Sequence, residues 1–258
     1  MRNMRHYVRL IAIGSVMALV AADAVAQADR RTGTTVTQQD VFASVHTRLA
    51  DAADRTLAAA LEDRPWMRTG SPVADSDASA NTVEPVVRLR AAVGRVQQLR
   101  PIIEPILRDE GVPSELSAVI LVESGGILTA LSPKGARGIW QFMPDTARRY
   151  GLVISNGRDD RLDIARSTHA AARYLRDLHQ QFGDWQLAFA AYNAGENAVD
   201  RALGRFGRGD FSAIQGALPQ ETRNYVPAIL QAIATLGGNT ETMFTSSRDH
   251  GQRRGRVL

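Results

Sequence analysis

Apolar residues recur three and four positions apart along most of the 258-residue chain, and this spacing predicts amphipathic helices. Glycine, proline, asparagine and aspartate interrupt the pattern at intervals typical of helix ends. No stretch shows the alternation of apolar and polar residues expected of a strand. The expected helices cover residues 36–61, 84–96, 101–111, 113–124, 162–182, 185–192, 198–206 and 221–236. The sequence therefore predicts an all-α fold.

The first 26 residues have the pattern of a cleavable signal peptide. Three arginines precede an apolar run from Leu10 to Val20, and small residues ending in Ala24-Val25-Ala26 follow it. The mature chain is expected to begin near Gln27 and to be periplasmic. The alternative is a retained anchor, although the run is short for a membrane span. Association with the outer membrane is left open, but there is no cysteine to carry a lipid or a disulfide.

The rest of the chain divides by composition into three parts. Residues 27–83 combine one expected helix with a stretch from Arg68 to Thr82 that is rich in small and polar residues, as linkers are. Residues 84–238 contain the remaining helices and are expected to form one compact domain. Residues 239–258 are polar and arginine-rich, which predicts a disordered tail.

The net charge of +4 and the isoelectric point near 9.9 come almost wholly from arginine, because Lys134 is the only lysine. Such a balance favours acidic polymers, which include nucleic acids, phospholipids and anionic wall glycans. Nucleic acid is disfavoured, because no stripe of interleaved aromatic and basic residues accompanies the charge. The histidines show no metal-ligand spacing, so no metal or other cofactor is expected.

One carboxylate has an unusual position in the helix expected over residues 113–124. Glu123 lies in its last turn, because Gly125 and Gly126 follow and end the helix. The apolar residues three, four and seven positions before it share its helix face. Apolar surroundings and the negative end of the helix dipole both raise the pKa of a carboxyl group, as a general acid requires. The alternative is a glutamate that extends from a frayed helix end into water.

Four short sequence blocks, beginning at this carboxylate, resemble those of the Slt-type lytic transglycosylases. Their residues are most similar to those of the membrane-bound D type. The blocks are Glu123-Ser124, Gly138-Ile-Trp-Gln141, Ala191-Tyr-Asn-Ala-Gly195 and Glu221-Thr-Arg-Asn-Tyr-Val226. They occur in the family's order over about 100 residues, which makes a chance match far less plausible than for any single block. The resemblance covers roughly residues 95–236 and implies a lysozyme-like (goose-type/Slt) helical catalytic domain with a substrate groove.

The resemblance implies that Glu123 is catalytic and that the other block residues bind substrate. Several of them also have structural readings: Ser124 as a turn residue, Gln141 as a surface amide, Asn193 as a helix cap, and Glu221 with Tyr225 as ordinary helix surface. Ser124 can alternatively bond the carboxyl of Glu123 and orient it. The implied substrate-binding residues are Ser124, Gln141, Met143, Tyr192, Asn193, Ala194, Glu221 and Tyr225.

The implied reaction cleaves the β-1,4 bond between N-acetylmuramic acid and N-acetylglucosamine in peptidoglycan strands. Glu123 would act first as acid and then as base, and the product would be 1,6-anhydro-N-acetylmuramic acid. The rivals are a goose-type lysozyme, which delivers water instead, and a wall-binding or secretion-system scaffold without activity. The protein is expected to be a monomer. Proteins of the cell wall or of a secretion system are left open as partners. Related sequences commonly place bulkier residues at Gly125-Gly126, which predicts a more open floor under Glu123.

Overall fold

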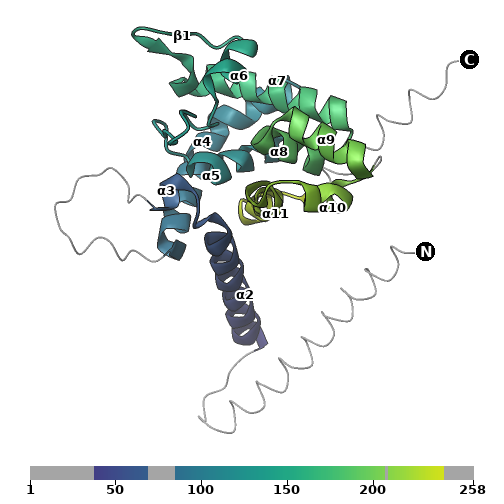
Figure 1. Cartoon of the computed structure of the whole chain (residues 1–258). Coiled ribbons are helices and arrows are strands. Elements are labelled where there is room, and N and C mark those ends of the chain that lie inside the picture. The colour runs from purple at the N-terminus through teal and green to yellow at the C-terminus, as the bar shows by residue number, and fades with distance from the viewer. Residues whose placement is uncertain (1–37, 69–84, 207–208, 241–258) are drawn as a thin grey trace, which may run out of the picture. The chain divides into compact units, whose positions relative to one another are not determined.

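The structure of the chain is a computed structural model that describes residues 38–68, 85–206 and 209–240 (Figure 1). The expected signal peptide, nearly all of the expected linker and residues 241–258 of the expected tail lie outside these ranges. The chain divides into two compact units, Met1–Ala53 and Asp54–Leu258. The second unit contains nearly all the described helices. The predicted all-α fold class is confirmed, with one addition: strands β1 (Ile154–Ser155) and β2 (Arg158–Asp159) form an antiparallel pair.

Helix α4 (Pro85–Asp109) runs without interruption through Pro101 and Pro105, where the sequence predicted a break. A proline inside a helix removes one backbone hydrogen bond and disfavours the helix. Here the buried face continues on both sides of Pro101, so packing outweighs the local preference. The buried residues of this face are Leu89, Ala92, Val96, Ile103 and Leu107.

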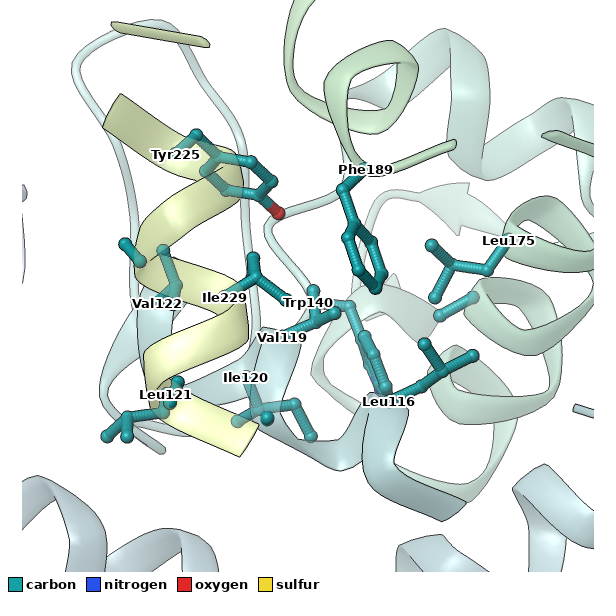
Figure 2. Packing of buried hydrophobic residues seen from close by; sticks show 14 of the residues in the cluster. Leu116, Val119, Ile120, Leu121, Val122, Trp140, Leu175, Phe189, Tyr225 and Ile229 are labelled. Atoms are coloured by element: carbon teal, nitrogen blue, oxygen red, sulfur yellow. The ribbon is translucent and has the colours of Figure 1, made fainter. Parts of the chain in front are cut away.

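The segment predicted as one helix over 113–124 begins as the 3₁₀ turn η2 (Ser114–Ser117) and continues as α5 (Ala118–Ser124). Gly125 ends it with φ +58°, a left-handed conformation that glycine adopts without strain. Helix α5 packs against α4 and α11 (Gln220–Thr235). Val119 and Val122 of α5 and Ile229 of α11 belong to the same buried cluster (Figure 2), which places the end of α5 inside the core.

Helix α8 (Trp185–Ala194) packs among several of the remaining helices, and its buried side chains include Trp185, Leu187 and Phe189. Helix α8 packs against α7 (Ile164–Phe182), α9 (Glu196–Phe206) and α11. Aspartate side chains cap α7, α8 and α10 (Phe211–Ile214) by accepting backbone N–H bonds, in agreement with the preference for Asp at this position. The other elements are α6 (Pro144–Arg149), η3 (Asp160–Leu162) and η4 (Gln215–Ala217).

The end of α2 (Gln38–Leu61) and the short α3 (Pro65–Arg68) belong to the second unit, although the sequence placed its boundary at residue 84. Leu57 and Leu61 are fully buried in the core, and Trp66 and Met67 are nearly so. The indole Nε1 of Trp66 donates a hydrogen bond to the carbonyl oxygen of Val122 at 3.2 Å. The compact unit therefore includes residues that precede the predicted boundary, because the apolar side chains of residues 57–67 complete the core around α5.

Candidate active site

Glu123 lies in the last turn of α5, with the fully buried Leu116, Val119 and Ile120 on the same side of the chain. The Glu123 side chain itself is only partly exposed. Burial raises the pKa of its carboxyl group above the ordinary value, and this is the largest influence on it. The predicted apolar position of Glu123 is confirmed, and the alternative of a carboxylate extending freely into water is not.

Two tyrosines lie around the carboxyl group. The hydroxyl of Tyr225, on α11, donates a hydrogen bond to Oε1 of Glu123 at 2.6 Å, and only 1% of the Tyr225 side chain is exposed. Figure 2 shows the Tyr225 hydroxyl directed away from α11 into the protein. Burial, and secondarily the nearby charge of Glu123, raise the pKa of both Tyr225 and Tyr192. Both phenols therefore stay protonated at neutral pH and can act as hydrogen-bond donors.

Asn193 and Glu221 lie together at the adjoining ends of α8 and α11. The Nδ2 atom of Asn193 donates to Oε1 of Glu221 at 3.3 Å, and its Oδ1 accepts from the hydroxyl of Thr222 at 2.8 Å. Glu221 is exposed, with 57% of its side chain accessible. Ala194 ends α8 and is partly buried. The structure thus brings these three predicted binding residues to the same edge of the site as Tyr225.

Gln141 lies in the loop between α5 and α6 and is the one non-glycine residue with positive φ (+50°) in the described parts of the chain. Its amide nitrogen donates to the carbonyl oxygens of Gly138 and Ala130, at 2.8 and 3.3 Å. The Tyr192 hydroxyl donates to the carbonyl oxygen of the neighbouring Trp140 at 2.8 Å. A positive φ outside glycine stores strain, which is tolerated where surrounding contacts fix the backbone, often at functional sites.

Ser124 has a different role from the one predicted. It is fully buried, and its hydroxyl donates to the carbonyl oxygens of Ile139 and Ile120, at 2.9 and 3.2 Å. The same oxygen accepts the N–H of Gly126. Ser124 therefore connects the end of α5 to the 138–142 loop, and the structure does not place it for substrate contact. Met143, by contrast, is 43% exposed just before α6 and is accessible to a ligand.

The predicted open floor under Glu123 is also wrong, because Trp66 fills the space beside Gly125. A Cβ atom added to Gly125 would lie 2.6 Å from the Trp66 ring, and one added to Gly126 would lie 3.0 Å from Cβ of Arg95. Larger side chains at these two positions have no room. Gly125 and Gly126 have no side chains to cover this part of the site, and the Trp66 ring of α3 fills the space in their place.

Arg64 is a site residue that the sequence did not predict. Its Nη1 lies 3.5 Å from Oε1 of Glu221, and its guanidinium lies over the Tyr225 ring at 5.0 Å from the centroid. Only 14% of its side chain is exposed. The positive charge of Arg64 lowers the pKa of Glu123, in opposition to burial. The one feature of the sequence that points to it is local: Arg64 lies two positions before Trp66, just after the end of the expected helix over residues 36–61.

The fold and the site define an all-α domain whose candidate catalytic group is one buried carboxyl bound by a tyrosine. Residues 100–215 match the family described as the Transglycosylase SLT domain. The matched range includes Glu123, Gln141 and Asn193. It ends before α11, which carries Glu221 and Tyr225, and begins after Arg64.

Two curated relatives and one solved structure are similar to the chain. The membrane-bound lytic murein transglycosylase D of Escherichia coli K12 is 40% identical over 129 residues, which are 48% of this chain and 28% of that protein. The soluble lytic murein transglycosylase of Salmonella typhimurium is 37% identical over 106 residues, 38% of this chain and 16% of that protein. The X-ray structure of lytic transglycosylase Slt from Pseudomonas aeruginosa matches at 27% identity and a TM-score of 0.46, over 54% of this chain and 24% of that one. The chain thus spans less than a third of the length of either curated relative.

Proposed function

We propose that the chain is a peptidoglycan lytic transglycosylase that cleaves the β-1,4 bond between N-acetylmuramic acid and N-acetylglucosamine. The observation that carries the proposal is the buried carboxyl of Glu123, hydrogen-bonded to Tyr225 within an SLT domain. A raised pKa gives a carboxyl group the proton that a general acid must hold near neutral pH. The names of the curated relatives, lytic murein transglycosylases, supply the substrate class.

In the proposed reaction Glu123 donates its proton to the glycosidic oxygen, and the bond from that oxygen to C1 of N-acetylmuramic acid breaks. The substrate's own N-acetyl group supports the positive charge that develops at C1. The carboxylate of Glu123 then takes the proton of the C6 hydroxyl, whose oxygen bonds to C1 and closes the 1,6-anhydro ring. Glu123 recovers its proton, the leaving sugar keeps the one it received, and no water is consumed.

The charges around the site favour a single acid/base carboxyl over a pair. Among the described carboxyl groups whose pKa is shifted, Glu123 is the only one whose pKa is raised. Hydrogen bonds and ion pairs from arginines lower the pKa of Asp159 and Asp160, so both are held as carboxylates. A scheme in which one carboxyl acts twice, with help from the substrate, agrees with this arrangement.

The residues around Glu123 have proposed roles that follow from their positions. Tyr225 donates to Glu123 and steadies the carboxylate formed after proton transfer. The exposed Met143 provides an apolar wall for sugar rings. The Gln141 side-chain nitrogen is bound to two backbone carbonyls, so its amide oxygen is the atom that accepts from sugar hydroxyl or acetamido N–H groups. Asn193, Ala194 and Glu221 form the edge beside Tyr225, with Glu221 on the side of the peptide stems, and Tyr192 connects α8 to the loop of Gln141 through its bond to Trp140.

The test is the product and its dependence on Glu123. Wild-type protein incubated with purified peptidoglycan should release fragments with 1,6-anhydro ends, which mass spectrometry detects as one water lighter than reducing ends. Glu123→Gln keeps the shape of the side chain but can neither donate nor recover a proton. Its cleavage rate should fall by roughly a hundred- to ten-thousand-fold, while binding to the glycan persists.

The outcomes separate the rival functions. Reducing N-acetylmuramic acid ends alone would identify hydrolysis of the lysozyme type and would refute the ring-closing step, whereas near-normal turnover by Glu123→Gln would refute Glu123 as the acid. Wall binding without any cleavage would support a scaffold instead. Glu115→Gln is the matched control, because Glu115 lies at the start of η2 and has no proposed part in the reaction.

Export is a separate proposal, supported by the pattern of residues 1–26. No helix in the described parts of the chain is long and apolar enough to cross a membrane. We expect the protein in a bacterial host to be cut after Ala26 and recovered from the periplasm. N-terminal sequencing checks this, and an intact N-terminus on periplasmic or membrane-bound protein would show a retained anchor.

A further inference from the structure

Residues 54–68 precede the residues matched by the SLT family, yet they contribute to the site around Glu123. We propose that Arg64 is a positioning residue of this site, which holds Tyr225 and Glu221 in place and supplies the positive charge that balances the Glu123 carboxylate. The expected effect of Arg64 on catalysis rests on the proposed function. Its contacts with Tyr225 and Glu221, and its effect on the charge state of Glu123, do not.

The backbone around Arg64 is fixed by its neighbours. The Trp66 indole donates to the carbonyl of Val122, the residue before Glu123, and the Trp66 ring fills the space beside Gly125. Arg88 of α4 donates to the carbonyl oxygen of Met67. Buried Leu61 holds the segment on the other side. These contacts tie residues 61–67 directly to the end of α5, so the Arg64 side chain starts from a fixed point next to the candidate acid.

From that point Arg64 reaches two residues on one face of α11. Its guanidinium lies over the Tyr225 ring at 5.0 Å, within the range of a cation–π interaction. Its Nη1 lies 3.5 Å from Oε1 of Glu221, the same oxygen that accepts from Asn193. Tyr225 in turn donates to Glu123. One arginine thus contacts the residue that binds the acid and the residue that links α11 to α8.

The charged and titratable groups that act on Glu123 come from three parts of the chain packed around it. Glu221, Tyr192 and Tyr225 lie on α8 and α11, and Arg64 lies between α2 and α3. Arg64 is the positive group among these four. In the proposed cycle Glu123 becomes a carboxylate after it protonates the leaving sugar, and a positive charge nearby stabilises that state. Arg64 is 14% exposed, so solvent screens its charge less than it screens a surface arginine.

The sign of the pH effect follows from these positions. Burial raises the pKa of Glu123, whereas Arg64 lowers it. Loss of the Arg64 charge should therefore let Glu123 keep its proton to higher pH. The alkaline limb of the rate profile reports loss of the proton from the acid, so it should move to higher pH. Glu123 should also donate its proton less readily, because its carboxylate form is less stable without the positive charge.

The experiment compares Arg64→Gln, Arg64→Lys and the control Arg68→Gln in the full chain. Arg68 lies four residues further along, is exposed, and pairs with the exposed Asp63. Cleavage is measured from about pH 4 to 10, with binding and turnover separated. For Arg64→Gln we expect an alkaline limb about one pH unit higher and a turnover roughly tenfold lower. Arg64→Lys should keep the wild-type limb, and Arg68→Gln should match wild type throughout.

A second readout does not depend on cleavage. In protein labelled with ¹³C at glutamate side-chain carboxyls, the signal absent from Glu123→Gln identifies Glu123, and its titration gives the pKa directly. Arg64→Gln should raise that pKa relative to wild type and Arg64→Lys should not. Equal titration in Arg64→Gln and wild type would overturn the inference, as would an equal shift in Arg64→Lys. If wild type fails to cleave peptidoglycan but the titration shifts as expected, the proposed function fails and the placement of Arg64 stands.

Discussion

Glu123 is subject to opposing influences that together suit a group with two duties. Burial raises its pKa and the charge of Glu221 adds to this, whereas Arg64 and the hydrogen bond from Tyr225 lower it. Burial alone would favour a permanently protonated acid, which cannot return as a base. A general acid that must also act as a base works best with a pKa near the working pH. The two lowering contacts come from residues far from Glu123 in sequence.

Gly138 permits the loop that carries Gln141. It has φ +79°, and a Cβ atom there would lie 1.9 Å from the carbonyl oxygen of Arg161. Gly135, three residues earlier, has φ +88° but nothing within 4 Å of an added Cβ. Gly138→Ala should therefore combine left-handed strain with an overlap that only a backbone shift can relieve, whereas Gly135→Ala should show the strain alone.

We expect Gly135→Ala to lower the free energy of unfolding by about 1–2 kcal/mol, and Gly138→Ala to lower it by at least about 2 kcal/mol more. Urea unfolding of both variants measures the difference. Because Arg161 also donates to the carbonyl oxygens of Gly135 and Phe142, Gly138→Ala should reduce cleavage as well. Equal losses in the two variants would contradict the close approach of Arg161.

At the scale of elements, local patterns predicted the long helices well. The apolar spacing and the Gly125 stop located α5, and Asp163 and Asp184 mark the starts of α7 and α8. The break expected at Pro101 is absent, because α4 buries one continuous face on both sides of the proline. The short α6, α10 and the two-residue strands were missed, since four to six residues hold too little periodicity to detect.

Only part of the candidate site could be predicted, because local patterns do not show which distant segments come into contact. Helical spacing placed Glu123 on an apolar face and Glu221 on the same face as Tyr225, but it cannot show which helices meet. The contact between Arg64 and Glu221 joins residues 157 positions apart, and no local pattern encodes it. Ser124 fits either a turn or the site from sequence alone, and only its contacts with Ile120 and Ile139 decide between them.

At the scale of the whole molecule, the working domain extends beyond the matched family on both sides. The match covers residues 100–215, while Arg64 precedes it and Tyr225 follows it. The compact unit begins at Asp54, and an ion pair between Arg90 and Asp54, at 3.0 Å, joins its first residue to α4. The buried side chains of residues 57–67 belong to the same core as α5 and α11. A domain cut at residue 84 would leave that core open beside Glu123.

The last prediction compares two fragments, residues 54–240 and 85–240. The shorter fragment loses the burial of Leu57, Leu61, Trp66 and Met67, and each such side chain contributes about 1.5–3 kcal/mol when fully buried. Their sum is comparable with the whole stability of about 5–15 kcal/mol typical of a domain. Fragment 54–240 should therefore unfold cooperatively at the denaturant concentration of the full chain and cleave peptidoglycan, while 85–240 should be largely unfolded. Trp66→Ala in the full chain gives an independent measure, with an expected loss of about 3–5 kcal/mol, and Val87→Ala serves as its exposed control. If fragment 85–240 instead unfolds at the denaturant concentration of the full chain and keeps its activity, residues 54–68 are dispensable. That result would refute the roles of Arg64 and Trp66 in the site and the start of the domain at Asp54.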